Sequence, residues 1–210
     1  MIVLSHRGYW LNPAEKNTRA AFERSFSLGF GTETDIRDRD SRLVIAHDMA
    51  DKNSMPLESF FETYKNFNTN LPLALNIKAD GLQSEVKRLL SLYQIESYFV
   101  FDMAVPDGLL YAKSQMTTFT RQSEYEKDPP YYDLAQGVWL DEFTGHWITD
   151  EVILHHMTHR KALCIVSPDL HKRDNTAEWQ HYKQLENRIG KDQILLCTDF
   201  PEKAREFFND

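Results

Sequence analysis

Short apolar segments alternate with amphipathic segments along almost the whole chain. The segments between the apolar ones place their apolar side chains at helical spacing. Strands are therefore expected at residues 2–5, 31–37, 73–77, 98–101, 116–120, 137–140, 162–166 and 194–197. Apolar strands that are each followed by a helix indicate a parallel sheet buried on both faces. Eight such units predict an α/β fold, a (β/α)8 TIM barrel, and because ~250 residues are typical of that fold, this barrel would be compact.

The amphipathic segments of this alternation predict the helices. A loose segment with Pro129 and Pro130 follows the strand at 116–120, and residues 43–46 form an extra strand outside the alternation. The rival architecture is a doubly wound open sheet, but no Gly-x-Gly-x-x-Gly sequence follows the first strand. No linker interrupts the pattern, so residues 1–210 are expected to form a single barrel domain. The helices are expected at 17–28, 55–67, 82–92, 107–114, 149–158, 176–189 and 201–208.

Composition excludes several classes of protein. The net charge of −8 argues against general nucleic-acid binding, which needs a basic surface. No apolar run approaches the ~18 residues of a membrane span, and the N-terminus has neither a basic region nor a long apolar region of a signal peptide. A cytoplasmic protein is therefore expected. Cys164 and Cys197 both lie in apolar runs, so we expect buried free thiols.

Polar side chains stand at the carboxyl end of each expected strand. In a (β/α)8 barrel these ends converge on one face, where enzymes of this fold place their active sites. Strand ends can also be polar simply because they meet water, and this alternative stays open for the later strands. The first three strands end in the pairs His6 and Arg7, Glu33 and Asp35, and Asn76 and Lys78, and the later ends carry Asp102, Arg121, Asp141 with Glu142, Ser167, and Thr198 with Asp199.

The first pairs have the composition of a metal-assisted hydrolytic site. Residues i and i+2 of a strand lie on the same side, so Glu33 and Asp35 are close enough to share one divalent cation. Oxygen ligands suit Mg²⁺ or Ca²⁺. His6, and His47 after the strand at 43–46, could divide the acid and base work of hydrolysis beside such a cation.

At these residues the sequence resembles the glycerophosphodiester phosphodiesterase family, within the PI-PLC-like phosphodiesterase superfamily. That family opens with His-Arg-Gly, a Pro-Glu-Asn-Thr helix start, Glu-x-Asp and an apolar strand ending in His-Asp, and it ends a late strand in Thr-Asp-x-Pro. The matching segments are His6-Arg7-Gly8, Glu15-Lys16-Asn17-Thr18, Glu33-Thr34-Asp35, His47-Asp48 and Thr198-Asp199-Phe200-Pro201.

The resemblance implies a (β/α)8 barrel and metal-dependent hydrolysis of a glycerol-type phosphodiester. It also implies roles for individual residues. His6 and His47 would be the catalytic acid/base pair, with the assignment of acid and base left open. The phosphate would be bound by Arg7 and Lys78, and the cation, Mg²⁺ or Ca²⁺, by Glu33, Asp35 and Asn76.

Two departures from the family pattern bear on the site. The family carries Glu-x-Lys at its third strand, where this chain has Asn76-Ile77-Lys78, so the expected metal site holds two carboxylates and an uncharged amide. Lys16 interrupts the usual helix-start motif. These departures put the usual substrate in question more than the reaction.

Three functions stay open from the sequence. The first is a phosphodiesterase that yields a phosphomonoester and an alcohol from a headgroup ester, a nucleotide-linked glycerol or a polysaccharide precursor. The second is a lyase of the same fold that releases a cyclic phosphate. The third is a non-catalytic phosphodiester-binding protein, suggested by Asn76. In each the partner is a small-molecule phosphodiester, with no nucleic acid and no membrane span, and the oligomeric state is open.

Overall fold

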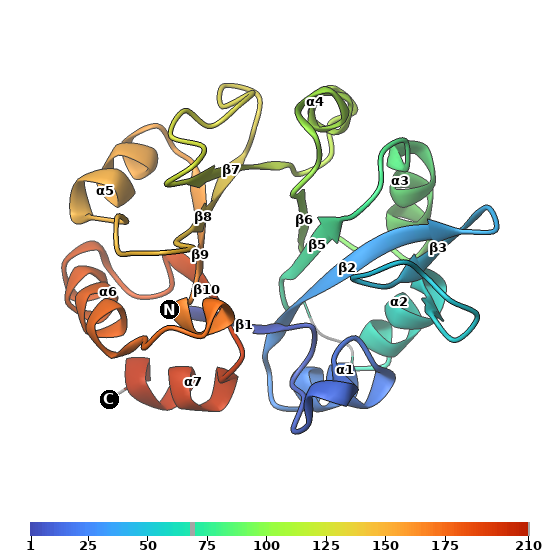
Figure 1. Ribbon diagram of the computed structural model, residues 1–210, viewed down its shortest axis with the longest axis horizontal. Coiled ribbons are helices and arrows are strands. Elements are labelled where there is room, and N and C mark those ends of the chain that lie inside the picture. Colours follow the sequence, from blue (N-terminus) through green and yellow to red (C-terminus); the bar gives the residue numbers. More distant parts are fainter. Residues whose placement is uncertain (68–69, 210) are drawn as a thin grey trace.

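The computed structural model describes residues 1–67 and 70–209, and a ring of eight parallel strands forms its centre (Figure 1). Neighbouring strands of the ring pair in parallel except at one junction, between β6 and β7, and the first strand pairs with the last. The predicted barrel architecture is therefore confirmed. In ring order the strands are β1 (Ile2–His6), β2 (Gly31–Arg39), β5 (Leu73–Ile77), β6 (Tyr98–Phe101), β7 (Phe119–Ser123), β8 (Gly137–Asp141), β9 (Ala162–Val166) and β10 (Ile194–Thr198).

One junction of the ring is weak. Between β6 and β7 the only pairing within the described residues is a single bridge, Val100 to Thr118, with a hydrogen bond from the Val100 N–H to the Thr117 carbonyl at 2.9 Å. The strand expected at 116–120 begins only at Phe119. The sheet is thus not strictly closed at this position.

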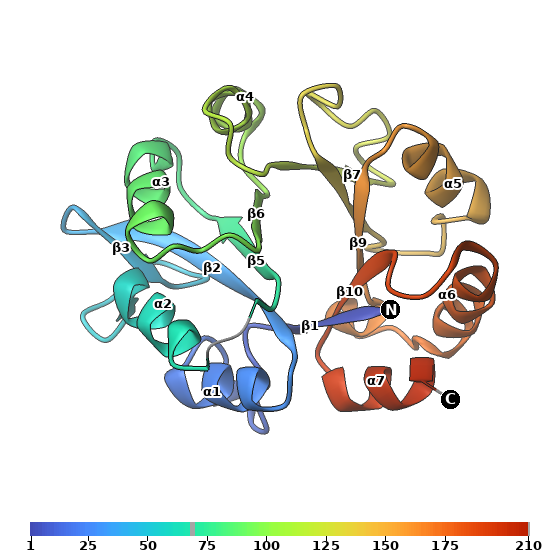
Figure 2. The same cartoon turned by 180° about the vertical axis from the view of Figure 1, so that it is seen from behind.

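Helices surround the ring on its outer side (Figures 1 and 2). Residues 124–136 form a loop where a complete barrel would have a helix, in agreement with the loose segment expected around Pro129 and Pro130. The described residues hold seven α-helices: α1 (Arg19–Ser27), α2 (Leu57–Lys65), α3 (Gln83–Leu92), α4 (Val105–Lys113), α5 (Asp150–Thr158), α6 (Thr176–Ile189) and α7 (Pro201–Asn209). Two short 3-10 helices, η1 (Pro13–Glu15) and η2 (Pro168–His171), follow β1 and β9.

A hairpin outside the ring carries one of the predicted site residues. β2 continues past the ring and pairs antiparallel with β3 (Arg42–Ile45), which in turn pairs with β4 (Met55–Pro56). The helix expected at 55–67 begins only at Leu57 because the two residues before it pair with β3. The hairpin places His47, two residues after β3, next to the carboxyl ends of the ring strands.

The interior of the ring is filled by apolar side chains. Phe99 stacks on Phe119 and Phe101 stacks on Trp139, each with ring centroids 3.9 Å apart. The two cysteines are free and buried, as expected. Apolar side chains fill the ring directly below the polar side chains at the strand ends. This apolar interior has a low dielectric, which strengthens the electrostatic interactions among those polar groups.

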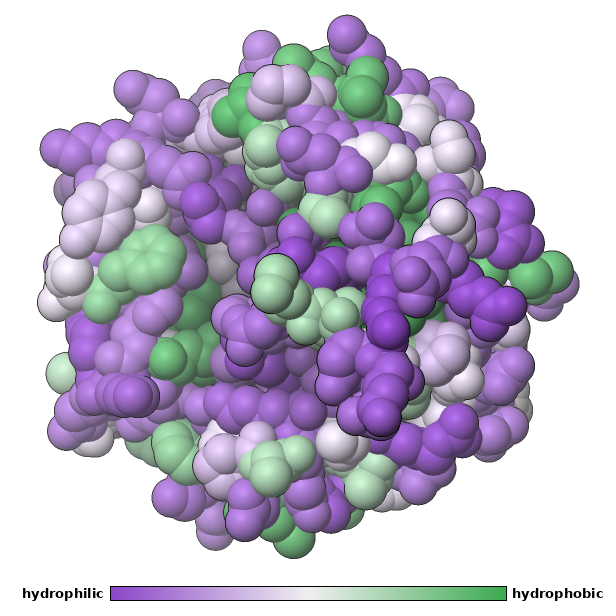
Figure 3. Space-filling model, turned by 45° about the vertical axis from the view of Figure 1, so that its right-hand side comes forward, coloured by the Kyte–Doolittle hydropathy of each residue, from purple (hydrophilic) through white to green (hydrophobic). Residues whose placement is uncertain are grey.

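Outside the ring, two further apolar clusters pack the helices against the strands, one under α1 to α3 and one under α5 to α7. With the side that carries the β2–β3 hairpin turned forward, the surface is mainly hydrophilic and its hydrophobic side chains lie in separate patches (Figure 3). Across residues 1–67 and 70–209, no helix combines the length and the apolar character that a membrane crossing requires.

Candidate active site

A pocket of about 210 Å³ opens at the carboxyl ends of the ring strands. Asp35 is the one predicted site residue that does not line it, because its side chain is fully buried beside the pocket. The structure therefore brings together residues that lie far apart in the sequence. The predicted site residues that line the pocket are His6, Arg7, Glu33, His47, Asn76 and Lys78.

Three predicted metal ligands each keep a buried oxygen atom without a hydrogen-bond partner. Strand register brings them together, since Asp35 lies opposite Asn76 between β2 and β5, and Glu33 precedes Asp35 by two residues on β2. The atoms are Glu33 Oε2, Asp35 Oδ1 and Asn76 Oδ1. An unpartnered buried oxygen is costly. Three of them on adjacent strands form the kind of hard oxygen donor set that Mg²⁺ or Ca²⁺ takes.

The two carboxylates of this group repel each other. Burial, and then the charge of Asp35, raises the pKa of Glu33 to about 8, although Arg7 and Lys78 act in the opposite direction. Arg7 and Lys78 thus offset only part of the cost of the Glu33 charge. Additional positive charge at this position would favour the ionised carboxylate, and this electrostatic deficit agrees with a cation site.

The loop after β1 turns sharply at Arg7 and Gly8, and the glycine makes this turn possible. Arg7 has a φ of 59° and Gly8 a φ of 81°, and a Cβ on Gly8 would lie 2.7 Å from the Ala21 Cβ. Only glycine fits there, so the chain can turn sharply under α1. The Arg7 N–H donates to the Glu33 carbonyl at 3.0 Å, and its Nε lies 3.1 Å from Asp35 Oδ2.

Lys78 supplies the second cation of the pocket. It follows β5, and its Nζ lies 3.6 Å from Asp35 Oδ1 and 3.2 Å from Asp102 Oδ2. Its side chain is mostly buried, with 18% exposed. Arg7 and Lys78 therefore flank Asp35 from both sides, and both also face the pocket. An anion that enters the pocket meets two positive charges that share the buried carboxylate of Asp35, and Lys78 also pairs with Asp102.

His6 is held in one orientation by a carboxylate from the last strand. Its Nδ1 lies 2.6 Å from Asp199 Oδ1, and its Nε2 lies 3.9 Å from Glu33 Oε2. An ionised carboxylate only accepts, so Nδ1 carries the proton and the Nε2 lone pair is free. Burial lowers the pKa of His6 below its usual value, although Asp199 acts against this. A neutral imidazole with a free Nε2 is suited to accept a proton.

The sequence analysis assigned no role to Asp199. Its own N–H donates to Asp169 Oδ2 at 2.8 Å, and the Lys16 Nζ lies 3.6 Å from its second oxygen. The barrel topology predicts the contact between His6 and Asp199, because a barrel places its last strand beside its first. Ser5 lies opposite Thr198, so the next residues, His6 and Asp199, become neighbours.

His47 lies at the rim of the pocket and is more exposed than His6. Its side chain is 42% exposed, and its Nδ1 lies 3.0 Å from Asp48 Oδ1. Two contacts fix its backbone, since Arg37 donates to the His47 carbonyl at 3.3 Å and the Ala46 N–H donates to the Asp35 carbonyl at 3.1 Å. The two histidines therefore face one pocket from different environments.

The remaining wall of the pocket is made of ion pairs. Asp102 contacts Arg121, which also contacts Glu126. Asp141 Oδ1 lies 2.6 Å from His171 Nε2, and this hydrogen bond raises the pKa of His171. Among the strand-end residues that could be polar simply because they meet water, Asp102, Arg121 and Asp141 thus line the pocket, but each is already engaged in an ion pair there.

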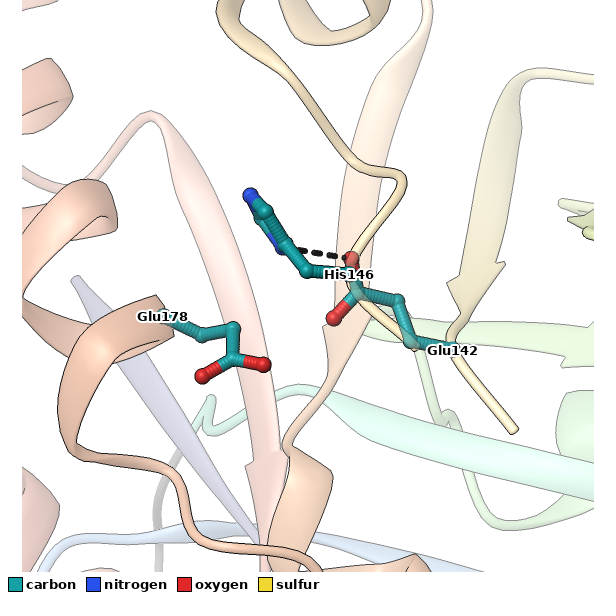
Figure 4. Close-up of side chains that lie close together, drawn as sticks. All are labelled: Glu142, His146 and Glu178. Carbon is teal, nitrogen blue, oxygen red and sulfur yellow. Dashed lines mark ion pairs between the residues drawn. The ribbon is translucent and has the colours of Figure 1, made fainter. Parts of the chain in front are cut away.

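Glu142, the neighbour of Asp141, does not line the pocket and lies instead in a second cluster with His146 and Glu178 (Figure 4). Potential ligand atoms of Glu142, His146 and Glu178 lie within 4.8 Å of one another, close enough to hold a cation. Their carboxylates already have partners, however. Glu142 Oε1 accepts the Trp147 and Ile148 N–H groups, and Arg173 lies 2.7 Å from Glu178 and 3.9 Å from Glu142. This cluster therefore lacks the unpartnered oxygens of the pocket.

Comparison with known proteins bears on the fold. No family profile and no curated protein matches the sequence. Solved structures do match: a candidate glycerophosphodiester phosphodiesterase from Galdieria sulphuraria has a TM-score of 0.77 at 18% identity, covering 99% of this chain and 97% of that one. The chain has the glycerophosphodiester phosphodiesterase fold. A phosphodiesterase from Oleispira antarctica, in complex with the product sn-glycerol-3-phosphate, matches at a TM-score of 0.73 and 14% identity, covering 100% and 97%.

A more distant match shares the same architecture. A Ca²⁺-dependent phosphatidylinositol-specific phospholipase C from Streptomyces antibioticus matches at a TM-score of 0.63 and 9% identity, covering 98% of this chain and 95% of that one. The glycerophosphodiester phosphodiesterase fold thus spans the whole chain. At these identities the likeness establishes the arrangement of strands and helices, and the chemistry rests on the side chains described above.

Proposed function

We propose that this protein is a metal-dependent phosphodiesterase that hydrolyses a small glycerol-type phosphodiester to a phosphomonoester and an alcohol. The observation that carries the proposal is the set of three unpartnered buried oxygens, from Glu33, Asp35 and Asn76, beside an oriented His6. An oxygen donor set next to a proton acceptor and two cations is what phosphodiester hydrolysis needs. The glycerophosphodiester phosphodiesterase fold of the neighbours supports the same reaction class.

The phosphate is assigned to Arg7 and Lys78. A phosphodiester carries one negative charge and gains charge at the leaving oxygen as the bond breaks. Arg7 can hold two phosphate oxygens through its guanidinium, and Lys78 can act as a point charge. Their shared partner Asp35 holds both cations in place, 3.1 Å from Arg7 Nε and 3.6 Å from Lys78 Nζ, so little ordering is needed when substrate binds.

The two histidines take different parts in proton transfer. His6 is buried, has a lowered pKa and presents a free Nε2 toward the pocket, so it accepts the proton of the nucleophile. His47 at the rim, 42% exposed, returns a proton to the leaving oxygen. Asp199 acts on the reaction through His6, whose tautomer and ring orientation it fixes.

The divalent cation is assigned to Glu33, Asp35 and Asn76. When bound, Mg²⁺ or Ca²⁺ would polarise the phosphoryl group and stabilise its developing charge. The donor set holds two carboxylates and one amide, so its charge is lower than that of a three-carboxylate site and its affinity should be modest. The Ca²⁺ dependence of the phospholipase C neighbour supports a cation of this class.

Two other outcomes remain within reach of the same site. One is a lyase of the same fold, in which a hydroxyl of the substrate would attack first. Such a lyase would stop at the cyclic phosphate. A protein that binds phosphodiesters without turnover would keep Arg7 and Lys78 but make no product.

A panel of small glycerophosphodiesters and nucleotide-linked glycerols, assayed with Mg²⁺, with Ca²⁺ and with EDTA, tests the proposal. Phosphorus NMR of the product separates a phosphomonoester from a cyclic phosphate. We expect turnover that EDTA abolishes and that Glu33→Gln reduces by ~10²-fold or more. Asp38→Asn, which removes an exposed charge from the same strand, is the matched control. Turnover that survives EDTA and Glu33→Gln would refute the metal-dependent mechanism.

A further inference from the structure

A second hollow of about 530 Å³ adjoins the catalytic pocket. One of its walls is the loop after β1 together with the start of α1, and the other is the segment from Ile45 to Met55. Arg7 and His47 line both the hollow and the pocket, so they stand at the boundary between the two. A diester held by Arg7, with its leaving oxygen facing His47, would therefore direct one arm into each recess.

The two recesses differ in size, and this difference indicates which arm of the diester occupies each recess. The catalytic pocket of about 210 Å³ has room for one small arm, such as glycerol. The hollow, at about 530 Å³, is more than twice as large. His47 is the proposed proton donor to the leaving oxygen and lies at the boundary, so the leaving arm belongs in the hollow.

The wall on the β1 side of the hollow is basic. Besides Arg7 it carries Lys16 and Arg19. The Lys16 Nζ is held in place, 3.6 Å from Asp199 Oδ2 and 4.5 Å from the centre of the Trp10 ring. Arg19 is the first residue of α1, is exposed, and forms no ion pair with any other residue of the described ranges. A protein with a net charge of −8 thus gathers three cations on one wall.

The acidic residues on the opposite wall are engaged locally. Asp51 accepts the Asn53 N–H at 2.9 Å and the Ser54 hydroxyl at 3.4 Å, which forms a tight turn. Asp48 lies against His47 Nδ1 at 3.0 Å. These contacts orient the two carboxylates, which keep their negative charge, so the groups that can attract an anion lie on the other wall, at Lys16 and Arg19.

We propose that the leaving arm of the substrate carries a second anionic group, a carboxylate or a phosphate, which Lys16 and Arg19 bind in this hollow. The inference rests on the proposed phosphodiesterase function and adds the class of leaving group. Lys16, which interrupts the family's helix-start motif, thereby gains a role in specificity. Lys16 and Arg19 would attract the anionic group of the leaving arm while Arg7 and Lys78 hold the scissile phosphate.

Matched pairs of substrates test this inference directly. Glycerophosphoserine and glycerophosphoethanolamine differ by one carboxylate, and glycerophosphoinositol 4-phosphate and glycerophosphoinositol differ by one phosphate. We expect kcat/KM to favour the more anionic member of at least one pair by about three- to tenfold, because a charge-assisted contact at a partly exposed site contributes that order. Arg19→Gln and Lys16→Gln should each bring the ratio within a pair toward one. Lys52→Gln, an exposed cation outside the hollow, should leave the ratio unchanged.

The outcomes separate this inference from the proposed function. Turnover of the diesters with no preference in either pair, or a preference that both Arg19→Gln and Lys16→Gln leave intact, overturns the inference and leaves the phosphodiesterase standing. If no diester is hydrolysed, the proposed function fails, and calorimetric binding of phosphoserine against phosphoethanolamine decides the inference. Stronger binding of phosphoserine that Arg19→Gln removes supports it, and equal binding refutes it.

Discussion

The two walls of the catalytic pocket are built by the same barrel geometry yet treat their charges differently. On the wall formed by β1, β2 and β5, Glu33, Asp35 and Asn76 each keep a buried oxygen without a hydrogen-bond partner. On the wall formed by the later strands, Asp102 pairs with Arg121 and also with Lys78, and Asp141 pairs with His171. The first wall is electrostatically incomplete and the second is complete.

This difference shows that a charged residue at a strand end is not sufficient for a cation-binding or catalytic site. Convergence of the strand ends brings both groups to the pocket. A cation finds free oxygen ligands only where the protein has not already paired them, because displacing an internal partner costs the interaction being replaced. Each of the following predictions tests whether the first wall acts in chemistry and the second in structure.

The largest effect is expected from the histidines. His6→Ala and His47→Ala should each lower kcat by ~10²–10⁴-fold, since each removes one side of general acid–base catalysis. Steady-state kinetics on the best diester of the panel measures this. His159→Ala, an exposed histidine on the far end of α5, is the control and should keep full turnover. Near-normal turnover of either variant would show that its histidine has no part in proton transfer.

Asp199 should affect both the rate and its pH dependence. The parent profile of kcat/KM should be bell-shaped, with its acid limb set by His6, whose pKa burial lowers. Asp199 acts to raise that pKa. Asp199→Asn should therefore move the acid limb to still lower pH and reduce kcat by ~10–10²-fold through a misoriented ring. An acid limb that stays in place would mean that Asp199 supports the fold alone.

Asn76 should set the strength of cation binding. Asn76→Glu adds a charged oxygen and should tighten the cation by about tenfold or more, because a charge-assisted contact is worth ~1.5–3 kcal/mol. Asn76→Ala should weaken it. Calorimetric titration with Mg²⁺ and Ca²⁺ is the measurement. If neither variant changes the affinity, Asn76 is no ligand and Asp141, on the opposite wall, becomes the better candidate.

Cation binding should also release a proton. The pKa of Glu33 is raised to about 8 by burial and by Asp35, so at pH 7 the pair holds a proton that the cation must displace. Affinity should then fall as the pH drops below about 8. Titrations at pH 7 in buffers of different ionisation enthalpy count the proton. A heat that does not depend on the buffer would place the cation elsewhere.

The smallest effect is expected on the paired wall. The hydrogen bond to Asp141 raises the pKa of His171. The pair should therefore stabilise the fold fully below pH ~6.5, the ordinary pKa of histidine, and lose that contribution as the pH rises through the raised value. Asp141→Asn should lower Tm by ~1–3 °C at pH 5.5 and by less at pH 8.5.

The same Asp141→Asn variant can break the comparison of the two walls. We expect its kcat to stay within about threefold of the parent, since Asp141 is engaged by His171 and is assigned no part in proton transfer or cation binding. A loss of activity or of cation affinity on the scale predicted for Glu33→Gln would show that the paired wall takes part in the chemistry.

The sequence alone was sufficient for the barrel and for most of the residues that line its pocket. The strands at Leu73–Ile77, Tyr98–Phe101 and Ala162–Val166 have the predicted bounds. Alternation of apolar runs with helical periodicity is local information, and it fixes where strands begin and end. The convergence of the strand ends then follows from the fold class. This convergence predicts that His6, Glu33 and Asn76 share one pocket, as they do in the structure.

Tertiary structure alone decided which of those charges are free. His6 meets Asp199 across 193 positions of sequence, and Asp141 meets His171 across a separate pair of strand ends. It also decided that Asp35 is buried between Arg7 and Lys78 and that Glu142 binds the Trp147 and Ile148 N–H groups instead of lining the pocket. Pairing depends on register and side-chain direction between strands distant in sequence. No local pattern records that information, because the same residue at a strand end can meet either a partner or an open pocket.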